Sequence, residues 1–172
     1  RFNDAGVETV EHAALFIVIN KTAFRGMYRE GPNGYNVPFG HYKTTPQLCT
    51  KGEFASISAM LQRVNFHCCD FTKSFKNVST GDFVYLDPPY APIDKKSFVG
   101  YTAGGFNLSM HEKLFELAKG LKSKKATFTM SNACVKLVTE SFKDYDIKKI
   151  VCRRAINSKK PGSTATEVLI TS

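Results

Sequence analysis

Apolar residues recur every three or four positions near the start of the chain, at Val7, Val10, Ala14, Ile17 and Val18. This spacing predicts an amphipathic helix that ends near Asn20. Between Lys21 and Lys43 the helical spacing of apolar residues ends. Glycines, prolines and an Asn-Gly pair alternate there with aromatic and basic residues. We expect a long hairpin here, with Tyr28-Arg29 and Tyr35-Asn36-Val37 as its strands. A loop of this length with its own aromatic and cationic side chains is more often functional than idle.

Helical and strand-like periods alternate through the rest of the chain. A second helix is expected from Thr45-Pro46 to about Gln62, followed by a short apolar strand over residues 64–69. Residues 83–86 are apolar at every position, which predicts a strand buried on both faces of a parallel sheet. The later patterns predict a helix opened by a capping box at Ser109–Glu112, a strand over 126–130, a helix through 135–142, and strands over 145–152 and 167–171. This alternation indicates an α/β fold.

Composition narrows the class of protein. The chain has 172 residues, of which 42% are hydrophobic, and this is enough apolar material for a folded domain. Lys and Arg number 24 against 15 Asp and Glu, which gives a formal net charge of +9. This surplus favours a nucleic-acid partner, although a Lys-rich surface that only keeps the protein soluble is the alternative.

Cysteine spacing and the length of apolar runs exclude other classes. The five cysteines form no C-x-x-C pair, which argues against a disulfide scaffold and a zinc site and favours a reducing, cytoplasmic interior. The longest apolar run, residues 13–19, is far shorter than the roughly 18 residues that span a bilayer. We therefore expect no membrane partner.

The tetrapeptide Asp87-Pro88-Pro89-Tyr90 directly follows the apolar segment 83–86. Ligands of open parallel sheets bind at the carboxyl ends of the strands, so both the position and the composition of this tetrapeptide favour a functional site. The alternative interpretation is a proline-rich turn that only ends the strand.

These residues carry a resemblance to a known family. Asp87–Tyr90 resembles the catalytic D-P-P-Y motif of amino-group DNA methyltransferases that use S-adenosylmethionine. The segments Phe24–Arg29, Asn36–Gly40 and Tyr42-Lys43 are similar to the target-recognition hairpin of the DNA adenine methylase family, and the similarity continues through Cys69–Phe71, Asp87–Pro92, Ser131-Asn132 and Val151–Arg154. The resemblance implies part of a Rossmann-like S-adenosylmethionine-dependent methyltransferase fold, with a helical and β-hairpin insertion that recognises double-stranded DNA.

The chemistry of the reaction explains the motif. The exocyclic amine of adenine is a poor nucleophile that cannot be reached inside a stacked duplex, so the base must flip out. The carboxylate of Asp87 and the carbonyl of Pro88 are acceptors that can take the two N–H groups of the amine and hold it for direct methyl transfer. Pro88 and Pro89 have a fixed φ and no N–H, which presents this carbonyl rigidly. The ring of Tyr90 offers a flat surface for the flipped base. Neither a metal nor a covalent enzyme intermediate is needed.

Further roles are implied by the resemblance alone. Asp70 and Phe71, with Asp87, are expected to hold the cofactor, and the alternative for the first two is a strand-ending Asp with a core Phe. Residues expected at the DNA are Phe24 and Arg25 beside the space left by the flipped base, Met27, Arg29 and Pro38 at base edges, Asn36 in the same hairpin, and Lys43, Arg153, Arg154, Lys159 and Lys160 at phosphates. A GATC-like target follows from this set. For each cation, a solvated surface position is the alternative.

Some features depart from the family pattern. His41 stands where an Arg or Lys is usual, and Phe24-Arg25 replaces the commoner aromatic-Asn pair. No glycine-rich F-x-G-x-G cradle occurs, from which we expect that an N-terminal segment, supplied in cis or in trans, is missing, and that the 172 residues alone bind S-adenosylmethionine weakly. Residues 1–63 are expected to form the target-recognition region and residues 64–172 the C-terminal part of the catalytic domain. The alternatives are a non-catalytic DNA-binding module, or a methyltransferase that acts on RNA or a protein amide.

Overall fold

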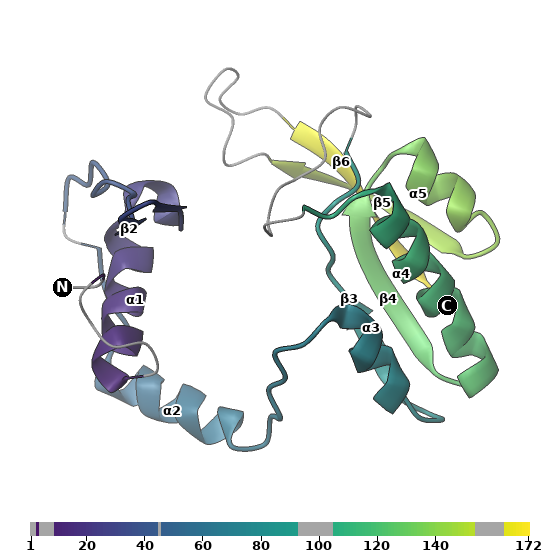
Figure 1. Cartoon of the computed structure of the whole chain (residues 1–172), viewed down its shortest axis with the longest axis horizontal. Helices are drawn as coiled ribbons and strands as arrows, with labels where there is room; N and C mark the ends of the chain where they lie inside the picture. Colours follow the sequence, from purple (N-terminus) through teal and green to yellow (C-terminus); the bar gives the residue numbers. More distant parts are fainter. Residues whose placement is uncertain (1–2, 4–8, 45, 93–104, 154–163) are drawn as a thin grey trace. The chain divides into compact units, whose positions relative to one another are not determined.

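The computed structural model describes residues 3, 9–44, 46–92, 105–153 and 164–172 (Figure 1). The chain divides into two compact units, Arg1–Phe66 and His67–Ser172. Within the described ranges, no helix combines the length and the apolar character that crossing a membrane requires.

Two helices of the first unit begin at threonine caps. α1 (Val10–Thr22) follows Thr9, whose hydroxyl accepts a hydrogen bond from a backbone N–H of the first turn. This helix matches the expected one and ends two residues later. α2 (Lys51–Leu61) begins after Thr50, which forms a capping box with Glu53. The prediction that this helix starts at Thr45-Pro46 was wrong, because the capping box fixes the first turn further along the chain.

The expected hairpin lies between these helices, after the short helix η1 (Phe24–Gly26). β1 (Glu30–Gly31) pairs antiparallel with β2 (Gly34–Tyr35), so both strands lie closer to the turn than the predicted Tyr28-Arg29 and Tyr35-Asn36-Val37. Gly34 has a φ of 85°, a conformation that the tight reversal needs and that glycine adopts without strain. One further bond, from the backbone N–H of Asn36 to the carbonyl of Arg29, extends the pairing at 3.1 Å.

The second unit has helices and strands in alternation. In chain order they are α3 (Phe71–Ser74), η2 (Phe75–Asn77), β3 (Phe83–Leu86), α4 (Leu108–Gly120), η3 (Leu121–Lys124), β4 (Thr127–Ala133), α5 (Lys136–Ser141), β5 (Asp146–Arg153) and β6 (Thr164–Thr171). α4 is capped by Asn107, whose side chain accepts from the backbone N–H of Met110 at 3.1 Å. The prediction of a capping box at Ser109 was therefore wrong, because the helix begins two residues earlier.

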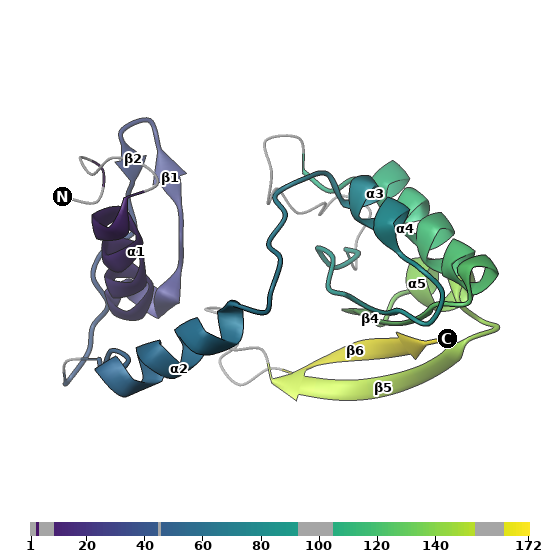
Figure 2. The same ribbon diagram turned by 90° about the horizontal axis from the view of Figure 1, so that it is seen from below.

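The four strands of the second unit form one mixed sheet in the order β3-β4-β6-β5. β3 and β4 are parallel, whereas β6 runs antiparallel to both β4 and β5. The α/β class predicted from the sequence is confirmed, but the sheet is mixed rather than wholly parallel. α3 and α4 lie on one side of this sheet (Figure 2).

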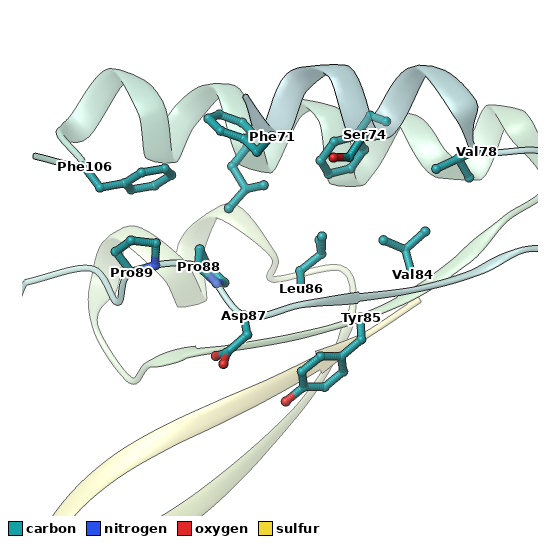
Figure 3. A pocket seen from close by; sticks show the side chains of 12 residues that line it. Phe71, Ser74, Val78, Val84, Tyr85, Leu86, Asp87, Pro88, Pro89 and Phe106 are labelled. Carbon is teal, nitrogen blue, oxygen red and sulfur yellow. The ribbon is translucent and has the colours of Figure 1, made fainter. Parts of the chain in front are cut away.

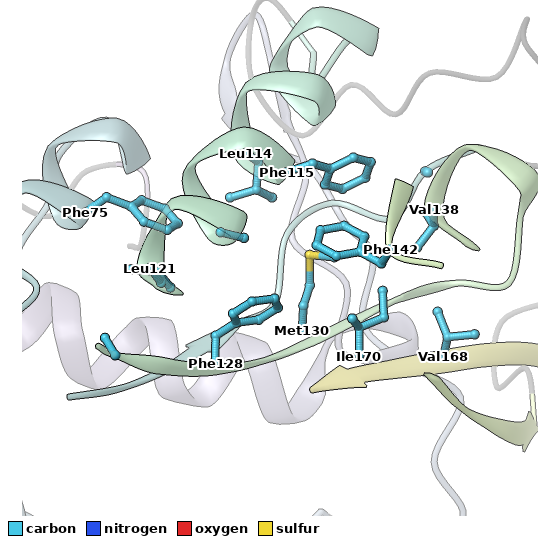
Figure 4. Close-up of a cluster of buried hydrophobic side chains, with 13 residues drawn as sticks. Phe75, Leu114, Phe115, Leu121, Phe128, Met130, Val138, Phe142, Val168 and Ile170 are labelled. Carbon is cyan, nitrogen blue, oxygen red and sulfur yellow. The ribbon is translucent and has the colours of Figure 1, made fainter. Parts of the chain in front are cut away.

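The hydrophobic core of the second unit fills the space between these helices and the sheet (Figure 4). Phe142, at the end of α5, is fully buried and makes ring contacts with Phe115, Phe128 and Tyr145. Val168 and Ile170 close the core from β6 and are also fully buried. This packing holds the carboxyl ends of β3 and β4 in place.

Two predictions about strands were wrong. β3 is not buried on both faces: Phe83 and Tyr85, on one face, are 63% and 59% exposed, while Val84 and Leu86, on the other, face the core. Residues 64–69 form no strand, and Phe66 is 73% exposed. A strand needs a partner for its backbone groups, and no strand among the described residues pairs with this segment.

Candidate active site at the end of strands β3 and β4

Two parallel strands bring polar residues to the same edge of the sheet. β3 ends at Leu86, opposite Met130 of β4, and continues directly into the loop Asp87–Tyr90. The next residues of β4 are Ser131 and Asn132. They lie beside the loop because the carboxyl ends of parallel strands meet at one edge.

Asp87 presents its carboxylate away from the core. Figure 3 shows this carboxylate on the same side of the strand as the ring of Tyr85, opposite to Val84 and Leu86. The hydroxyl of Ser131 donates to one oxygen, Oδ1 of Asp87, at 2.7 Å. Ser131 is only 6% exposed, whereas Asp87 is exposed, so a buried donor fixes one oxygen of a carboxylate that solvent and ligands can reach.

Tyr90 is half-buried, and its hydroxyl donates to Oε2 of Glu167 on β6 at 3.3 Å. Burial of the phenol raises its pKa above the usual value, and the negative charges of Glu167 and Asp87 raise this pKa further, while the nearby Ser131 hydroxyl lowers it. Tyr90 therefore stays protonated at neutral pH, and the hydrogen bond from its hydroxyl to Glu167 restrains the orientation of the ring.

Asn132 holds the residue that follows the loop. Its side chain is fully buried, and Oδ1 accepts from the backbone N–H of Ala91 at 2.9 Å and from that of Ala133 at 2.9 Å. Ala91 is itself 2% exposed. The end of the loop is thus anchored in the interior.

A cavity of about 370 Å³ opens between α3 and β3 beside the loop (Figure 3). Its walls are mostly apolar, and Asp87 and the two prolines contribute one end of it. The lining residues that frame the opposite wall are Phe71, Phe75, Val78 and Phe106. The rings of Phe71 and Phe106 pack against each other with centroids 5.7 Å apart, and together they give this end of the cavity an aromatic wall.

Asp70 is the N-cap of α3 and directly precedes Phe71, which lines the cavity. Its Oδ1 accepts from the backbone N–H and the hydroxyl of Thr72, at 3.0 and 2.5 Å. These bonds, with the charge of Lys73, hold the pKa of the Asp70 carboxyl below its usual value. Both bonds fall on one oxygen, so Oδ2 is able to accept from a ligand hydroxyl.

The hairpin of the first unit fixes an arginine. Nε of Arg29 donates to Oδ1 of Asn36 at 2.8 Å, and a terminal nitrogen donates to the carbonyl of Asn36 at 3.2 Å. The remaining N–H groups of the guanidinium form a rigid edge that can bind a planar acceptor pair. Asn3 braces the turn, since its side chain accepts from the backbone N–H of Tyr35 and donates to the carbonyls of Asn33 and Tyr35.

The start of the hairpin is held in an unusual backbone conformation. Arg25 has a φ of 57°, which is rare for a residue with a side chain, and its guanidinium lies over the ring of Phe24, 5.1 Å from the centroid. The backbone N–H of Phe24 donates to the carbonyl of Pro38 at 2.8 Å, and Gly40 donates to Thr22 at 2.8 Å. These hydrogen bonds hold the strained backbone conformation of Arg25 in place, at the turn that leads into the hairpin.

Comparison with known proteins identifies the family. A model of the D12 class N6 adenine-specific DNA methyltransferases matches residues 1–156. The chain belongs to this class of methyltransferase. The family implies a methyl donor, generally S-adenosylmethionine, and DNA as the substrate of its members.

Individual relatives agree with this assignment. The chain is 36% identical over 167 residues to the Type II methyltransferase M1.LlaDCHI of Lactococcus lactis subsp. cremoris, which covers 94% of the chain and 58% of that protein. It is 32% identical over 173 residues to the DNA adenine methylase of Haemophilus influenzae, covering 99% of the chain and 59% of the relative. The DNA adenine methylase of Escherichia coli is 30% identical over 158 residues, covering 91% and 55%. The chain thus spans a little more than half the length of these methyltransferases.

The residues predicted for the methyltransferase site fall into two groups. Those expected at the target amine and the cofactor gather in the second unit, at the end of β3 and the start of α3: Asp70, Phe71, Asp87, Pro88, Pro89 and Tyr90. Those expected in the hairpin gather in the first unit: Phe24, Arg25, Met27, Arg29, Asn36 and Pro38. Lys43 is exposed after the hairpin, and Arg153 is exposed at the end of β5. Arg154, Lys159 and Lys160 lie outside the described residues.

The contacts that Ser131, Asn132 and Glu167 make with the loop Asp87–Tyr90 and with Ala91 were not predicted from the sequence. Ser131 and Asn132 were noted only as part of the resemblance, although polar residues at the end of a strand parallel to β3 are a signal for the same edge of the sheet. Nothing in the sequence around Glu167 indicated that it lies near this loop. Its place beside Tyr90 depends on the antiparallel pairing of β6 with β4, which joins Glu167 to Ala133 across 34 residues of sequence (167 − 133 = 34).

Proposed function

We propose that the protein acts in the transfer of a methyl group from S-adenosylmethionine to the exocyclic amine of adenine in duplex DNA. One observation carries the proposal: Ser131 holds the Asp87 carboxylate at the tip of β3, near Tyr90, and the backbone of the same loop closes one end of an apolar cavity. Acceptors, an aromatic surface and a cavity therefore meet at the same place.

The proposed roles of the loop follow from its chemistry. A carboxylate oxygen of Asp87 and the backbone carbonyl of Pro88 accept the two N–H groups of the flipped adenine and aim the nitrogen lone pair. Tyr90 supports the base by stacking, and its ring is steadied by the bond to Glu167. Because the target must leave the duplex to reach these groups, base flipping is part of the proposal.

The residues around the cavity fit the methyl donor. An adenine ring can lie against the apolar wall that Phe71 and Phe106 form together, and the second carboxylate oxygen of Asp70 can accept from a ribose hydroxyl. When bound, the donor supplies an electrophilic methyl group on a cationic sulfur. Asp87 forms one end of the cavity, and its carboxylate lies on the other side of β3 from Val84 and Leu86, where it favours positive charge beyond that end.

The hairpin is proposed to recognise the DNA sequence. The guanidinium edge of Arg29, oriented by Asn36, suits the O6 and N7 acceptors of guanine. Met27 and Pro38 supply apolar contacts to a thymine methyl, and Phe24 and Arg25 occupy the space left by the flipped base. A GATC-like site accounts for this combination. The exposed cations at the phosphates, of which Lys43 and Arg153 are described, add affinity without sequence preference.

The proposed architecture is a Rossmann-like methyltransferase fold. The parallel pair β3 and β4, with an antiparallel hairpin of β5 and β6 beside it and helices on one face, is consistent with the C-terminal part of such a domain. In this proposal residues 1–63 are the target-recognition region and residues 64–172 belong to the catalytic domain.

Methyl transfer to a panel of DNA duplexes tests the function and its target. The full-length protein is incubated with labelled methyl donor and duplexes that carry GATC or a single change in it, with single-stranded RNA and a glutamine peptide as competitors. We expect transfer to the GATC duplex, and a rate lower by about 10- to 100-fold for each changed base pair, as loss of a bidentate base contact predicts. Equal rates on all duplexes would reject the GATC target, and preferential labelling of RNA or peptide would reject the DNA substrate.

A further inference from the structure

The loop Asp87–Tyr90 is tied to two neighbouring strands by three side chains. We infer that Ser131 is a positioning residue for methyl transfer, and that Asn132 and Glu167 complete the same support by holding the end of the loop and the ring of Tyr90. This inference rests on the proposed function, because it assigns these residues a role in aiming the acceptors that hold the target amine.

Ser131 acts on the carboxylate directly. Its hydroxyl donates to Oδ1 of Asp87 at 2.7 Å, and the same oxygen atom of Ser131 lies 3.4 Å from the carbonyl of Leu86. A hydroxyl has one hydrogen, and the shorter, charge-assisted bond to Asp87 takes it. With Oδ1 occupied and the carboxyl rotation fixed, Oδ2 is left to accept from an incoming amine.

Asn132 restrains the backbone from the opposite side of the strand. Consecutive residues of a strand point to opposite faces, so Ser131 reaches Asp87 on one face while Asn132 is buried on the core face. Pro88 and Pro89 have no N–H, which leaves Tyr90 and Ala91 as the first backbone donors after Asp87. The amide of Ala91 is bonded to Asn132 at 2.9 Å, and this bond fixes the direction of the chain that carries the Pro88 carbonyl.

Glu167 fixes the far edge of the aromatic surface. Its Oε2 accepts from the hydroxyl of Tyr90 at 3.3 Å, from a strand that pairs with β4 and not with β3. Side chains from β4 and β6 therefore support the first and fourth residues of the loop and Ala91, the residue that follows it. A displacement of about 1 Å in such a site can lower a rate by about 100-fold, so support of this kind affects the chemical step more than binding.

Single-turnover kinetics on the full-length protein test the role of Ser131. The substitution Ser131→Ala should lower the rate constant of methyl transfer by about 10- to 100-fold, while the dissociation constants for duplex DNA and for the methyl donor change less than threefold. Ser131→Thr keeps a hydroxyl and should recover most of the rate. Thr129→Ala is the matched control: it removes a hydroxyl from the same face of β4, one that contacts Thr171 rather than the loop, and should leave the rate unchanged.

Amide hydrogen exchange followed by NMR measures the support without reference to activity. Asn132→Leu should raise the exchange rate of the Ala91 amide by at least tenfold relative to amides in the middle of β4, whereas Thr129→Ala should not. If the wild-type protein transfers methyl groups and Ser131→Ala does so at the same rate, the positioning role is overturned and the proposed function stands. An inactive wild type would reject the proposed function, and an unchanged Ala91 exchange rate in Asn132→Leu would overturn the support itself.

Discussion

His111 is a polar residue in an apolar environment. It is fully buried on α4, its ring lies 4.7 Å from that of Phe106 and 6.0 Å from that of Phe115, and neither ring nitrogen has a hydrogen-bond partner among the described residues. Burial disfavours the charged imidazolium and lowers its pKa below the usual value near 6.5. The folded protein therefore keeps His111 neutral under conditions in which the unfolded chain takes up a proton.

This residue should make stability depend on pH in a defined direction. Because the folded pKa is depressed, the full stability is present above about pH 6.5, and it is lost as the pH falls from there toward the folded pKa. We expect the free energy of unfolding, measured by urea titration, to decrease between pH 7.5 and pH 5.5. His111→Phe should reduce this decrease, while His41→Gln, at an exposed position, should not. An identical pH dependence in wild type and His111→Phe would contradict the assignment.

At the same scale, the sequence allowed the residues of one loop to be predicted but not their partners. Asp87 and Tyr90 could be found because they are adjacent in sequence and follow an apolar strand. Glu167 could not, since its proximity to Tyr90 is created by the pairing of β6 with β4, and no local pattern encodes that register. Contacts between strands that are far apart in the sequence are therefore the part of the site that the sequence does not predict.

At the scale of elements, the hairpin of the first unit is a rigid support for one side chain. Its strands are only two residues long, and the bond from Arg29 to Asn36 adds a side-chain connection across them. The rings of Tyr28 and Tyr35, with centroids 5.5 Å apart, pack across the same pair of strands. Arg29 is thus held by its neighbours before any DNA is bound, which reduces the entropy lost on binding.

Removing this support should affect specificity more than affinity. We expect Asn36→Ala to reduce discrimination at the guanine position of the target by about 1 to 3 kcal/mol, because Arg29 loses its fixed orientation. Lys43→Ala is the comparison: loss of one phosphate contact should weaken binding to all duplexes alike and lower the salt slope by about 1. Fluorescence anisotropy with matched and mismatched duplexes at several salt concentrations measures both effects. A uniform loss of affinity in Asn36→Ala would show that Asn36 does not orient Arg29.

The elements that the sequence predicted well are those with a strong local period, such as α1, β4 and β5. The errors arose where neighbours decide the outcome. Four apolar residues in β3 gave no indication that one face would be open, because that depends on which elements pack over each face of the sheet. Residues 64–69 have the composition of a strand but no strand among the described residues pairs with them. Local composition predicts the capacity to pair, and the partner decides whether pairing occurs.

At the scale of the whole molecule, the two units differ in how much of their apolar surface is buried. The second unit contains the core, with fully buried residues contributed by α4, α5, β4 and β6. The helices α1 and α2 of the first unit have no buried residues. A well-packed unit that holds the loop Asp87–Tyr90, and a less buried unit that carries the hairpin, fit the proposed division between chemistry and DNA recognition. The net charge of +9 favours association of the whole chain with a polyanion.

The central claim is that Asp87 holds the amine of a flipped adenine for methyl transfer. The most direct measurement treats a GATC duplex with the full-length protein and a labelled methyl donor, digests the DNA and identifies the labelled nucleoside by mass spectrometry. The account predicts label in N6-methyldeoxyadenosine alone, and a loss of about 100-fold or more in Asp87→Ala with DNA affinity retained. Label in cytosine, or transfer that Asp87→Ala does not diminish, would contradict it.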